Sequence, residues 1–528
     1  MKALAGAAVL WVVSALAPPI CARTAPDRAS AEVRDRARAW RAGREAVLVK
    51  ELSDFLAIPN VASDASNIRR NADFILAMLR RRGVEARLLE VPGSPPAVFG
   101  ELKTPGARRT VVLYAHYDGQ PVSGSGWESG PWDPVLRDKP LDAGGRKIDW
   151  PSPGARFDPE WRLYARSASD DKSPIAAVLW AIDALRAAGS RPSVNLKLFL
   201  DGEEEAGSPH MAAMLEKHRA ALAGDLWLLL DGPVHQSRRM QVYFGARGVQ
   251  DLEITAYGAT RRLHSGHYGN WAPNPGAEIA HVVSSLRGPD GRIRVRGLMD
   301  DVRPATESER RAVVESPDVE EALARELGLS AGAVSRERAA EGILRPAINV
   351  RGIAAGDVGE KATNSIPTEA QASIDFRLVP DLTPEKVRRR VEEHLRAAGY
   401  HLVPEEPGPE LRRQHAKILR LQWGPGYSPA RTSLDLPESR AVVRAIEGWS
   451  GGPIIRLPTL GGSVPMHLFA ETMRVPVIGV PIVNHDNNQH APNENVRLQN
   501  LWDGIEIYAV LFARLGEIWK VESKGDTP

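Results

Sequence analysis

Four short apolar runs, each followed at once by acidic residues or histidines, constrain the fold of this chain more than any other feature of its sequence. The runs cover residues 110–114, 194–200, 226–230 and 475–480. The polar residues that follow them are His116 and Asp118, then Asp201, Glu203, Glu204 and Glu205, then Asp231, and finally His485, Asp486 and His490. Short, nearly continuous apolar runs are typical of strands that are buried on both faces of a parallel sheet. Open α/β sheets bind their ligands beyond the carboxyl ends of the strands, so the sequence predicts an α/β catalytic domain with a mostly parallel central sheet, helices on both faces and a site at the strand ends.

A further pair of acids stands directly before a predicted helix. Ser173 can serve as the N-cap, Pro174 fits the first helical position, and Gly189 fits the end of the helix. Asp170 and Asp171 would then lie just outside a helix N-terminus, where negative charge is favoured.

The middle of the chain has a different pattern. Residues 250–257 and 371–378 alternate apolar and polar side chains, as half-buried strands do, and helices are predicted over 276–286 and 385–398. Strands exposed on one face and covered by helices on the other suggest an inserted α+β domain over about 245–425.

The catalytic domain would then consist of residues 45–244 and 426–528. Within the insert, the charged and Ala-rich segment 300–340 is predicted to form solvated helices. Segment 138–157, which is rich in Pro, Gly and charge, is predicted to be a surface loop.

The N-terminus is predicted to be a targeting segment. Lys2 is followed by a mostly apolar run over residues 3–17, which is shorter than the roughly 20 residues of a membrane span. We interpret residues 1–22 as a signal peptide, so the protein is expected to be exported to the periplasm or secreted. A lipoprotein attached at Cys21 and a retained membrane anchor are the alternatives, although Ile20 occupies a position where a lipid-attachment signal requires a small residue.

The cysteine count and the charge restrict the chemistry. Cys21 is the only cysteine, and cleavage after Ala22 would remove it, so the mature chain would have no disulfide, zinc–thiolate site or cysteine nucleophile. Any metal must then be held by His, Asp and Glu. The formal net charge is +2 and is spread along the chain, which does not favour nucleic acid as a partner.

The residues at the strand ends suit a pair of zinc ions. Such a site needs histidine nitrogens, carboxylate oxygens that include a bridging one, and a general base that is not a ligand. Taken alone, each candidate has an ordinary explanation: a surface histidine near an acid, a solvated charge run, or a turn residue. Three adjacent acids at a strand end repel one another unless a cation neutralises them, and the whole set lies consistently at the ends of elements.

Seven stretches in this order resemble the co-catalytic two-zinc metallopeptidase family. They are residues 116–121, 170–172, 204–208, 263–266, 377–381, 461–465 and His490. The closest resemblance is to the carnosinase and non-specific dipeptidase branch of the family, which also contains carboxypeptidase G, aminoacylase, acetylornithine deacetylase and succinyl-diaminopimelate desuccinylase. The resemblance runs from about residue 45 to the C-terminus.

The resemblance implies a metal site with two Zn²⁺ ions per subunit. His116 and Asp231 would bind one ion, Glu205 and His490 would bind the other, and Asp170 would bridge both. Mn²⁺ or Co²⁺ could replace zinc at such ligands.

The resemblance also implies catalytic and substrate-binding roles. Glu204 would be the general base and Asp118 would orient His116. In the inserted lid, His264 would polarise the scissile carbonyl, often from the partner subunit of a homodimer. The substrate-binding residues would be Arg377, which would bind the substrate carboxylate, together with Asn364 and Ser463. From the residues alone, His264 could instead be a hydrogen-bonded turn histidine, and Arg377 could pair with Asp375 or Asp381.

The predicted function is therefore a metallopeptidase of the dipeptidase or carboxypeptidase type that cleaves an amide bond next to a free carboxylate. An N-acyl-amino-acid deacylase is the alternative, and a non-catalytic peptide-binding protein is a third reading. One stretch departs from the family, which usually has glycines on either side of the bridging aspartate. Residues 165–173 contain no glycine, so side chains are added near a tight backbone and the geometry of this loop is expected to differ.

Overall fold

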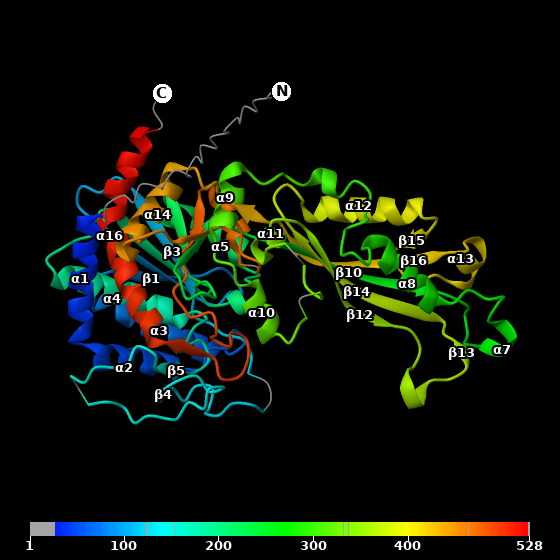
Figure 1. Cartoon of the computed structure of the whole chain (residues 1–528), viewed down its shortest axis with the longest axis horizontal. Helices are drawn as coiled ribbons and strands as arrows, with labels where there is room; N and C mark the ends of the chain where they lie inside the picture. The colour runs from blue at the N-terminus through cyan, green and yellow to red at the C-terminus, as the bar shows by residue number, and fades with distance from the viewer. Residues whose placement is uncertain are drawn as a thin grey trace, which may run out of the picture.

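The computed structural model shows two bodies joined side by side (Figure 1). The residues it describes are 27–122, 125–152, 154–330, 332–335, 337–462 and 464–525. The predicted signal peptide, residues 1–22 with Cys21, and the predicted substrate-binding residue Ser463 lie outside the described residues.

The first body is built on an eight-stranded sheet with the order β1-β2-β6-β3-β7-β19-β8-β18. In that order the strands are Glu85–Leu89, Ala97–Leu102, Asn195–Asp201, Thr110–His116, Leu226–Leu229, Val477–Gly479, Gln241–Tyr243 and Ile455–Leu457. The four central strands, β6, β3, β7 and β19, are mutually parallel, and each overlaps one of the four apolar runs. Antiparallel pairings join β1 to β2, β2 to β6 and β19 to β8. The predicted α/β class with a mostly parallel central sheet is confirmed.

Helices cover both faces of this sheet because its strands alternate their side chains between two apolar clusters. From β3, Val111 and Leu113 belong to one cluster, while Val112 and Tyr114 belong to the other. The main helices of the first cluster are α1 (Arg28–Ala42), α2 (Glu45–Leu56), α3 (Ala65–Arg80), α4 (Lys172–Ala187), α14 (Pro437–Ser450) and α16 (Leu498–Gly525). Those of the second are α5 (Met211–Lys217), α6 (Arg219–Leu222) and α15 (Met466–Met473).

Helix α4 begins earlier than its sequence predicts. It starts at Lys172 with Asp171 at the N-cap position, so the assignment of Ser173 as N-cap is wrong. The Ser173 hydroxyl instead donates a hydrogen bond to the carbonyl of Ala168. Gly189 follows the end of the helix with a φ of +65°, a left-handed conformation that favours glycine.

The second body is built on a five-stranded sheet with the order β12-β14-β10-β16-β15. In that order the strands are Ala347–Ala354, Glu369–Leu378, Gly248–Tyr257, Ile418–Tyr427 and His401–Val403. Only β15 and β16 pair in parallel. Helices α8 (Pro275–Leu286) and α12 (Pro384–Ala397) pack against this sheet around a separate apolar cluster. The strands and helices predicted for the insert are therefore present, whereas its boundaries at 245 and 425 stay predictions.

Segment 300–340 contains helices that are only partly solvated. They are α9 (Glu307–Glu315), α10 (Glu320–Glu326) and α11 (Ala339–Ile343), the last of which ends just beyond the segment. Glu309, Ala312 and Val313 of α9 are buried, and Ala312 belongs to the core cluster of the first body. Helix α9 therefore contacts the first body, contrary to the prediction of solvated helices.

The remaining elements are short. Strands β4 (Val135–Arg137), β5 (Arg162–Tyr164) and β20 (Asn495–Arg497) form a three-stranded sheet, and the predicted loop 138–157 lies between β4 and β5. Two-stranded pairs join β9 (Gly245–Ala246) to β17 (Ala430–Arg431) and β11 (Leu263–His264) to β13 (Ser365–Ile366). Helices α7 (Ser265–Tyr268) and α13 (Pro409–Gln414) complete the second body. Among the helices of the described ranges, none combines the length and apolar character that a membrane crossing needs.

The close packing of β19 against Tyr243 predicts a stability effect at Gly479. A Cβ atom added there would lie 2.0 Å from two atoms of the buried Tyr243 ring. We expect Gly479→Ala to lower the free energy of unfolding by about 1–3 kcal/mol or more, because the core has no room for a methyl group. Denaturant unfolding followed by circular dichroism measures this. The control is Gly352→Ala in β12, where the added atom meets nothing within 4 Å; equal unfolding midpoints for the two variants would contradict the packing argument.

Candidate metal centre

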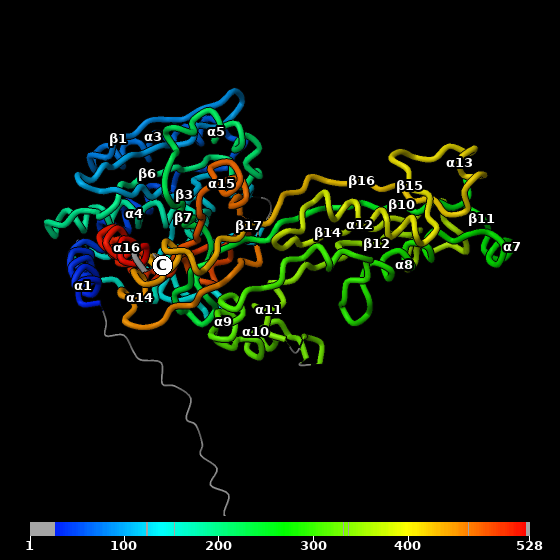
Figure 2. The backbone as a smooth tube through the Cα atoms, turned by 90° about the horizontal axis from the view of Figure 1, so that it is seen from above, coloured from blue at the N-terminus to red at the C-terminus, as the bar shows by residue number. Residues whose placement is uncertain are grey.

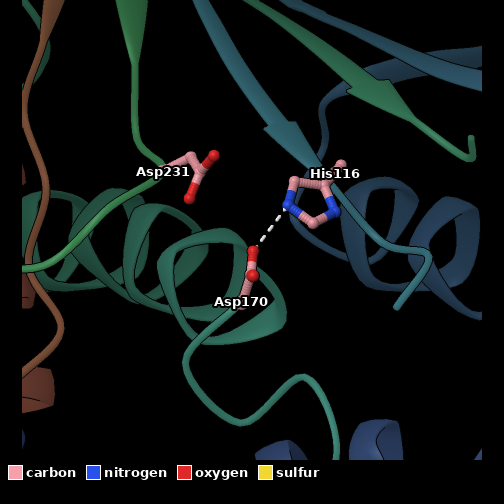
Figure 3. Close-up of side chains that lie close together, drawn as sticks. All are labelled: His116, Asp170 and Asp231. Carbon is pink, nitrogen blue, oxygen red and sulfur yellow. Dashed lines mark hydrogen bonds and ion pairs between the residues drawn. The ribbon is translucent and has the colours of Figure 1, made fainter. Parts of the chain in front are cut away.

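Two groups of metal-binding side chains meet at the carboxyl ends of the central strands. One consists of His116, Asp170 and Asp231, all buried, whose ligand atoms lie within 4.8 Å of one another (Figure 3). The other consists of Asp170, Glu205 and His490, within the same limit. Asp170 belongs to both groups, so a single carboxylate joins the two.

The two oxygens of Asp170 face different histidines. Its Oδ1 lies 2.8 Å from Nε2 of His116, and its Oδ2 lies 3.1 Å from Nε2 of His490. The same nitrogen of His490 is 3.4 Å from Oε2 of Glu205. This is the arrangement that a carboxylate bridging two metal ions requires.

The fold brings these residues together from distant parts of the chain. His116 is the last residue of β3, Asp170 stands just before α4, and Asp231 follows β7. Because β3 and β7 are adjacent and parallel, their carboxyl ends meet at one edge of the sheet. Glu205 lies in a short 3₁₀ turn (Glu204–Ala206) beyond β6, and His490 lies in the loop between β19 and β20.

Asp118 connects two parts of the site. Its carboxylate, which is fully buried, accepts hydrogen bonds from the backbone N–H groups of Glu204 and Glu205 at 3.0 Å each. Its Oδ1 also lies 3.4 Å from Nδ1 of His116, and the same ring nitrogen is 3.2 Å from its main-chain carbonyl. Asp118 therefore holds both the ring of His116 and the turn that carries the two glutamates.

Burial and mutual repulsion raise the pKa values of several acids in the site. Burial, followed by the charge of Asp170, raises the pKa of Glu205 to about 7 and that of Asp231 to about 6. Burial also raises the pKa of Glu204 well above its usual range. Burial acts to raise the pKa of Asp170 as well, but hydrogen bonds from His116 and the other groups around it outweigh this and hold the pKa below its usual value.

These residues fit zinc. Imidazole nitrogens and carboxylate oxygens are ligands that zinc binds in proteins, and a cation between the acids would relieve the repulsion that raises their pKa values. Both groups described here consist of His, Asp and Glu side chains.

The structure adds polar residues that the sequence analysis did not single out. Nε2 of Gln120 donates to Glu205 and Nε2 of Gln489 donates to Asp170, both at 2.6 Å. Gln120 lies within the family-like stretch 116–121, and Gln489 is next to His490. These positions were the only sign in the sequence that the two side chains belong to the site.

Two of the predicted lid residues lie together, far from the metal-binding side chains of the same chain. His264 pairs with Ser365 across β11 and β13, and the backbone N–H of Ser265 donates to the carbonyl of Asn364 at 2.9 Å. Elements β11 and α7 form the outer tip of the second body, whereas β3 and β7 lie in the first body (Figure 2). His264 is exposed, and its Nδ1 accepts a hydrogen bond from the backbone of Gly266.

Arg377 lies elsewhere, near the start of β10 and at the end of the second body that is nearer the first body. Its Nε donates to Asp375 at 3.2 Å, so the pairing with Asp375 that the sequence allowed is present. Arg247 stands directly before β10, close to Arg377, and burial followed by the charge of Arg377 lowers its pKa to about 10. Positive charge is thus concentrated at this end of the sheet.

The loop without glycines keeps a conformation that glycine favours. Ser167 has a φ of +61°, in the left-handed region, and its hydroxyl accepts a hydrogen bond from Asn60 at 2.8 Å. The missing glycines therefore do not prevent a left-handed turn, because polar contacts hold it.

Comparison with known proteins identifies the family. The model of the Peptidase family M20/M25/M40 matches residues 112–514, so the chain belongs to this family. The Cys-Gly metallodipeptidase dug1 of Schizosaccharomyces pombe is 24% identical over 498 residues, covering 89% of this chain and 96% of that protein. The Beta-Ala-His dipeptidase of Homo sapiens is 25% identical over 431 residues, covering 80% of this chain and 78% of that protein.

Solved structures agree with this assignment. The M20 family metallo-carboxypeptidase Sso-CP2 from Sulfolobus solfataricus has a TM-score of 0.70 and 27% identity, covering 89% of this chain and 99% of that one. Human carnosine dipeptidase 1 has a TM-score of 0.68 and 23% identity, covering 92% and 99%. The chain is thus an enzyme of the metallopeptidase class, as its sequence predicts.

The raised pKa values predict how the stability of the metal-free protein depends on pH. Asp231, Glu205 and Asp201 have pKa values of about 6, 7 and 7, above the value of about 4 in an unfolded chain. An acid whose pKa is raised by folding binds its proton more tightly in the folded protein than in the unfolded chain. Its contribution to the free energy of unfolding is therefore lost as the pH rises from about 4 through the folded pKa. The contribution of His116, whose pKa is also raised, is lost above about pH 6.5, while that of Asp170, whose pKa is lowered, is already complete above about pH 4.

We therefore expect the thermal unfolding midpoint of chelator-treated protein to fall between about pH 5 and pH 8, because the folded protein loses its extra protons over this range. Zinc-loaded protein should show a smaller fall, because a bound cation lowers the pKa of its carboxylate ligands. Differential scanning calorimetry at several pH values measures both. A midpoint of the metal-free protein that rises over this range would contradict the electrostatic account.

Proposed function

We propose that this protein is a two-zinc dipeptidase that hydrolyses the amide bond of dipeptides or short peptides with a free C-terminal carboxylate. The observation that carries the proposal is the double contact of Asp170, whose two oxygens face the two separate histidines of the site. Family membership and the similarity to a Cys-Gly metallodipeptidase and a Beta-Ala-His dipeptidase support the substrate class.

The metal ligands would be the two groups described above. His116, Asp231 and Asp170 would hold one zinc ion, and Asp170, Glu205 and His490 would hold the other. When bound, zinc in such a site supplies Lewis-acid polarisation of the substrate carbonyl and lowers the pKa of a water molecule.

Glu204 would act as the general base. It would accept a proton from the attacking water and return it to the leaving amine. The backbone hydrogen bond to Asp118 fixes the turn on which Glu204 stands.

Arg377 would bind the substrate carboxylate. Asp375 fixes the guanidinium group through Nε, which sets the plane of a group suited to bidentate carboxylate binding. Asn364 would bind substrate from the lid and Ser463 would line the same pocket as Arg377. A positive pocket of this kind would favour substrates with a free C-terminus over substrates without one.

The enzyme would work as a homodimer through its inserted domain. His264 and Asn364 lie at the outer tip of the second body, while the metal-binding side chains lie in the first body of the same chain (Figures 1 and 2). This separation favours a role for His264 in the site of a second copy, where it would stabilise the oxyanion. We also propose that the protein is exported, to the periplasm or outside the cell, on the basis of residues 1–22.

The substrate class and the general base can be tested together. We expect the mature protein to hydrolyse dipeptides and to lose this activity with a chelator. Glu204→Gln should lower kcat by about 10²–10⁴-fold while zinc content stays at two ions, because the variant loses the proton acceptor and no ligand. The control is Glu203→Gln, since Glu203 pairs with His210 at 2.9 Å and is not in either ligand group.

Several outcomes would decide against the proposal. Turnover of N-acetyl amino acids but not of dipeptides would replace it with the deacylase function. Full activity of Glu204→Gln would remove Glu204 from its role. Zinc-loaded, folded protein that turns over neither class would favour a peptide-binding protein.

The role of the second subunit predicts complementation between two inactive variants. Glu204→Gln keeps His264, and His264→Ala keeps Glu204, so a mixed dimer would contain one complete site. We expect each variant alone to be nearly inactive, and an equal mixture after subunit exchange to recover about a quarter of the wild-type kcat. Activity of the mixture no greater than the mean of the separate variants, or an active monomer in sedimentation, would show that His264 does not act across a dimer.

A further inference from the structure

The carboxylate of Glu494 is the most heavily hydrogen-bonded group around the metal centre. It is fully buried and lies four residues after His490. It accepts five hydrogen bonds, all from residues 166–170, which we call the Asp170 turn. The donors are Nη1 of Arg166 at 2.8 Å, the backbone N–H groups of Ser167, Ser169 and Asp170 at 3.0 Å each, and the hydroxyl of Ser169 at 2.9 Å.

These bonds are divided between the two oxygens of Glu494. Oε2 accepts from Arg166 and Ser167, and Oε1 accepts from Ser169 and Asp170. The bond from Arg166 comes from a charged guanidinium group, so it is charge-assisted and stronger than a bond between neutral groups. The guanidinium of Arg166 also lies over the ring of Trp127, with its carbon 5.1 Å from the ring centre, so the turn is held from its outer side as well.

The Asp170 turn needs such an anchor because part of its backbone has a conformation that residues other than glycine rarely adopt. Ser167 has a left-handed backbone at a place where a side chain other than glycine is disfavoured. Glu494 binds the N–H of this residue directly. The backbone contact is returned by the carbonyl of Glu494, which accepts a hydrogen bond from Ala165 at 3.1 Å.

We infer that Glu494 is a positioning residue that sets the orientation of the Asp170 carboxylate and its distance from His490. Glu494 lies four residues after His490 in the sequence, and its carboxylate accepts a hydrogen bond from the backbone N–H of Asp170. It therefore fixes the loop that carries one ligand against the turn that carries the shared ligand. This inference rests on the proposed two-zinc site, whose bridging role requires both oxygens of Asp170 to be aimed within tenths of an ångström.

The substitution Glu494→Gln tests the inference with little change in volume. Both oxygens of Glu494 accept N–H donors, so an amide NH₂ in either orientation faces donors and loses at least two bonds. The matched control is Glu506→Gln in α16. Glu506 is also a buried carboxylate, 1% exposed, which accepts two hydrogen bonds from Arg38 at 2.9 Å and one from Trp449. It belongs to neither ligand group, so it reports the stability cost alone.

We expect Glu494→Gln to weaken the binding of at least one of the two zinc ions by about 10–100-fold, as measured by competition with a chromogenic chelator. The visible absorption spectrum of the cobalt-substituted variant should change, because the ligand field depends on how Asp170 is held. At saturating zinc, kcat should fall more than KM changes. Glu506→Gln should lower the unfolding midpoint but keep the zinc affinity, the cobalt spectrum and kcat of the wild type.

A second variant covers the case in which Glu494→Gln does not fold. Ser169→Ala removes only one donor to Glu494 and leaves the backbone bonds in place. It should weaken zinc binding in the same direction by a few-fold.

Two results would separate the failure of this inference from the failure of the proposed function. If the wild-type protein binds two zinc ions and cleaves dipeptides, but Glu494→Gln and Ser169→Ala keep its zinc affinity and cobalt spectrum, Glu494 serves stability alone and the inference is wrong. If the wild-type protein itself binds no zinc, the proposed metal site is wrong, and the positioning role falls with it.

Discussion

The shared carboxylate of Asp170 is the interaction on which the site depends. It is buried, and its two oxygens contact histidines that are separated by more than 370 residues of sequence, since His116 ends β3 and His490 follows β19. A buried carboxylate is costly unless hydrogen bonds or cations compensate it. Gln489 and the two histidines provide this compensation directly, and the bonds of Glu494 keep the backbone in place. A small displacement of either loop would break one of these contacts.

The central sheet makes this arrangement possible because its four central strands are parallel. Strands β6, β3, β7 and β19 lie side by side in the same direction, so the residues that follow them converge at one edge. Their apolar side chains are divided between two clusters, which places helices on both faces and leaves the strand ends as the open side. Burial, followed by the charge of Asp170, raises the pKa values of Glu205 and Asp231 at this edge, and a rigid scaffold keeps these acids together against their repulsion.

The second body carries the predicted lid residues at its two ends. Arg377 and Arg247 lie together at one end, and His264 and Asn364 lie at the outer tip. Under the proposed function, one end would bind the substrate carboxylate and the other would donate to the oxyanion in a second copy. The two bodies are linked by more than the connecting strands, because Glu309 of α9 pairs with the buried Arg431 of β17 at 3.3 Å.

The sequence by itself determined the central strands and the class of fold, and it pointed to the acids and histidines that the structure gathers into two groups able to hold a metal. Short, nearly continuous apolar runs are typical of strands buried on both faces, and adjacent acids that follow such a strand repel one another unless a cation neutralises them. Tertiary structure alone decided which oxygen of Asp170 meets which histidine, and which polar residues hold it. Gln120, Gln489 and Glu494 look like solvated loop residues in the sequence, because a hydrogen bond to a group 85 or more residues away leaves no local pattern. The start of α4 was misplaced for a local reason, since the hydroxyl of Ser173 bonds to the carbonyl of Ala168, five residues earlier, and does not cap the helix.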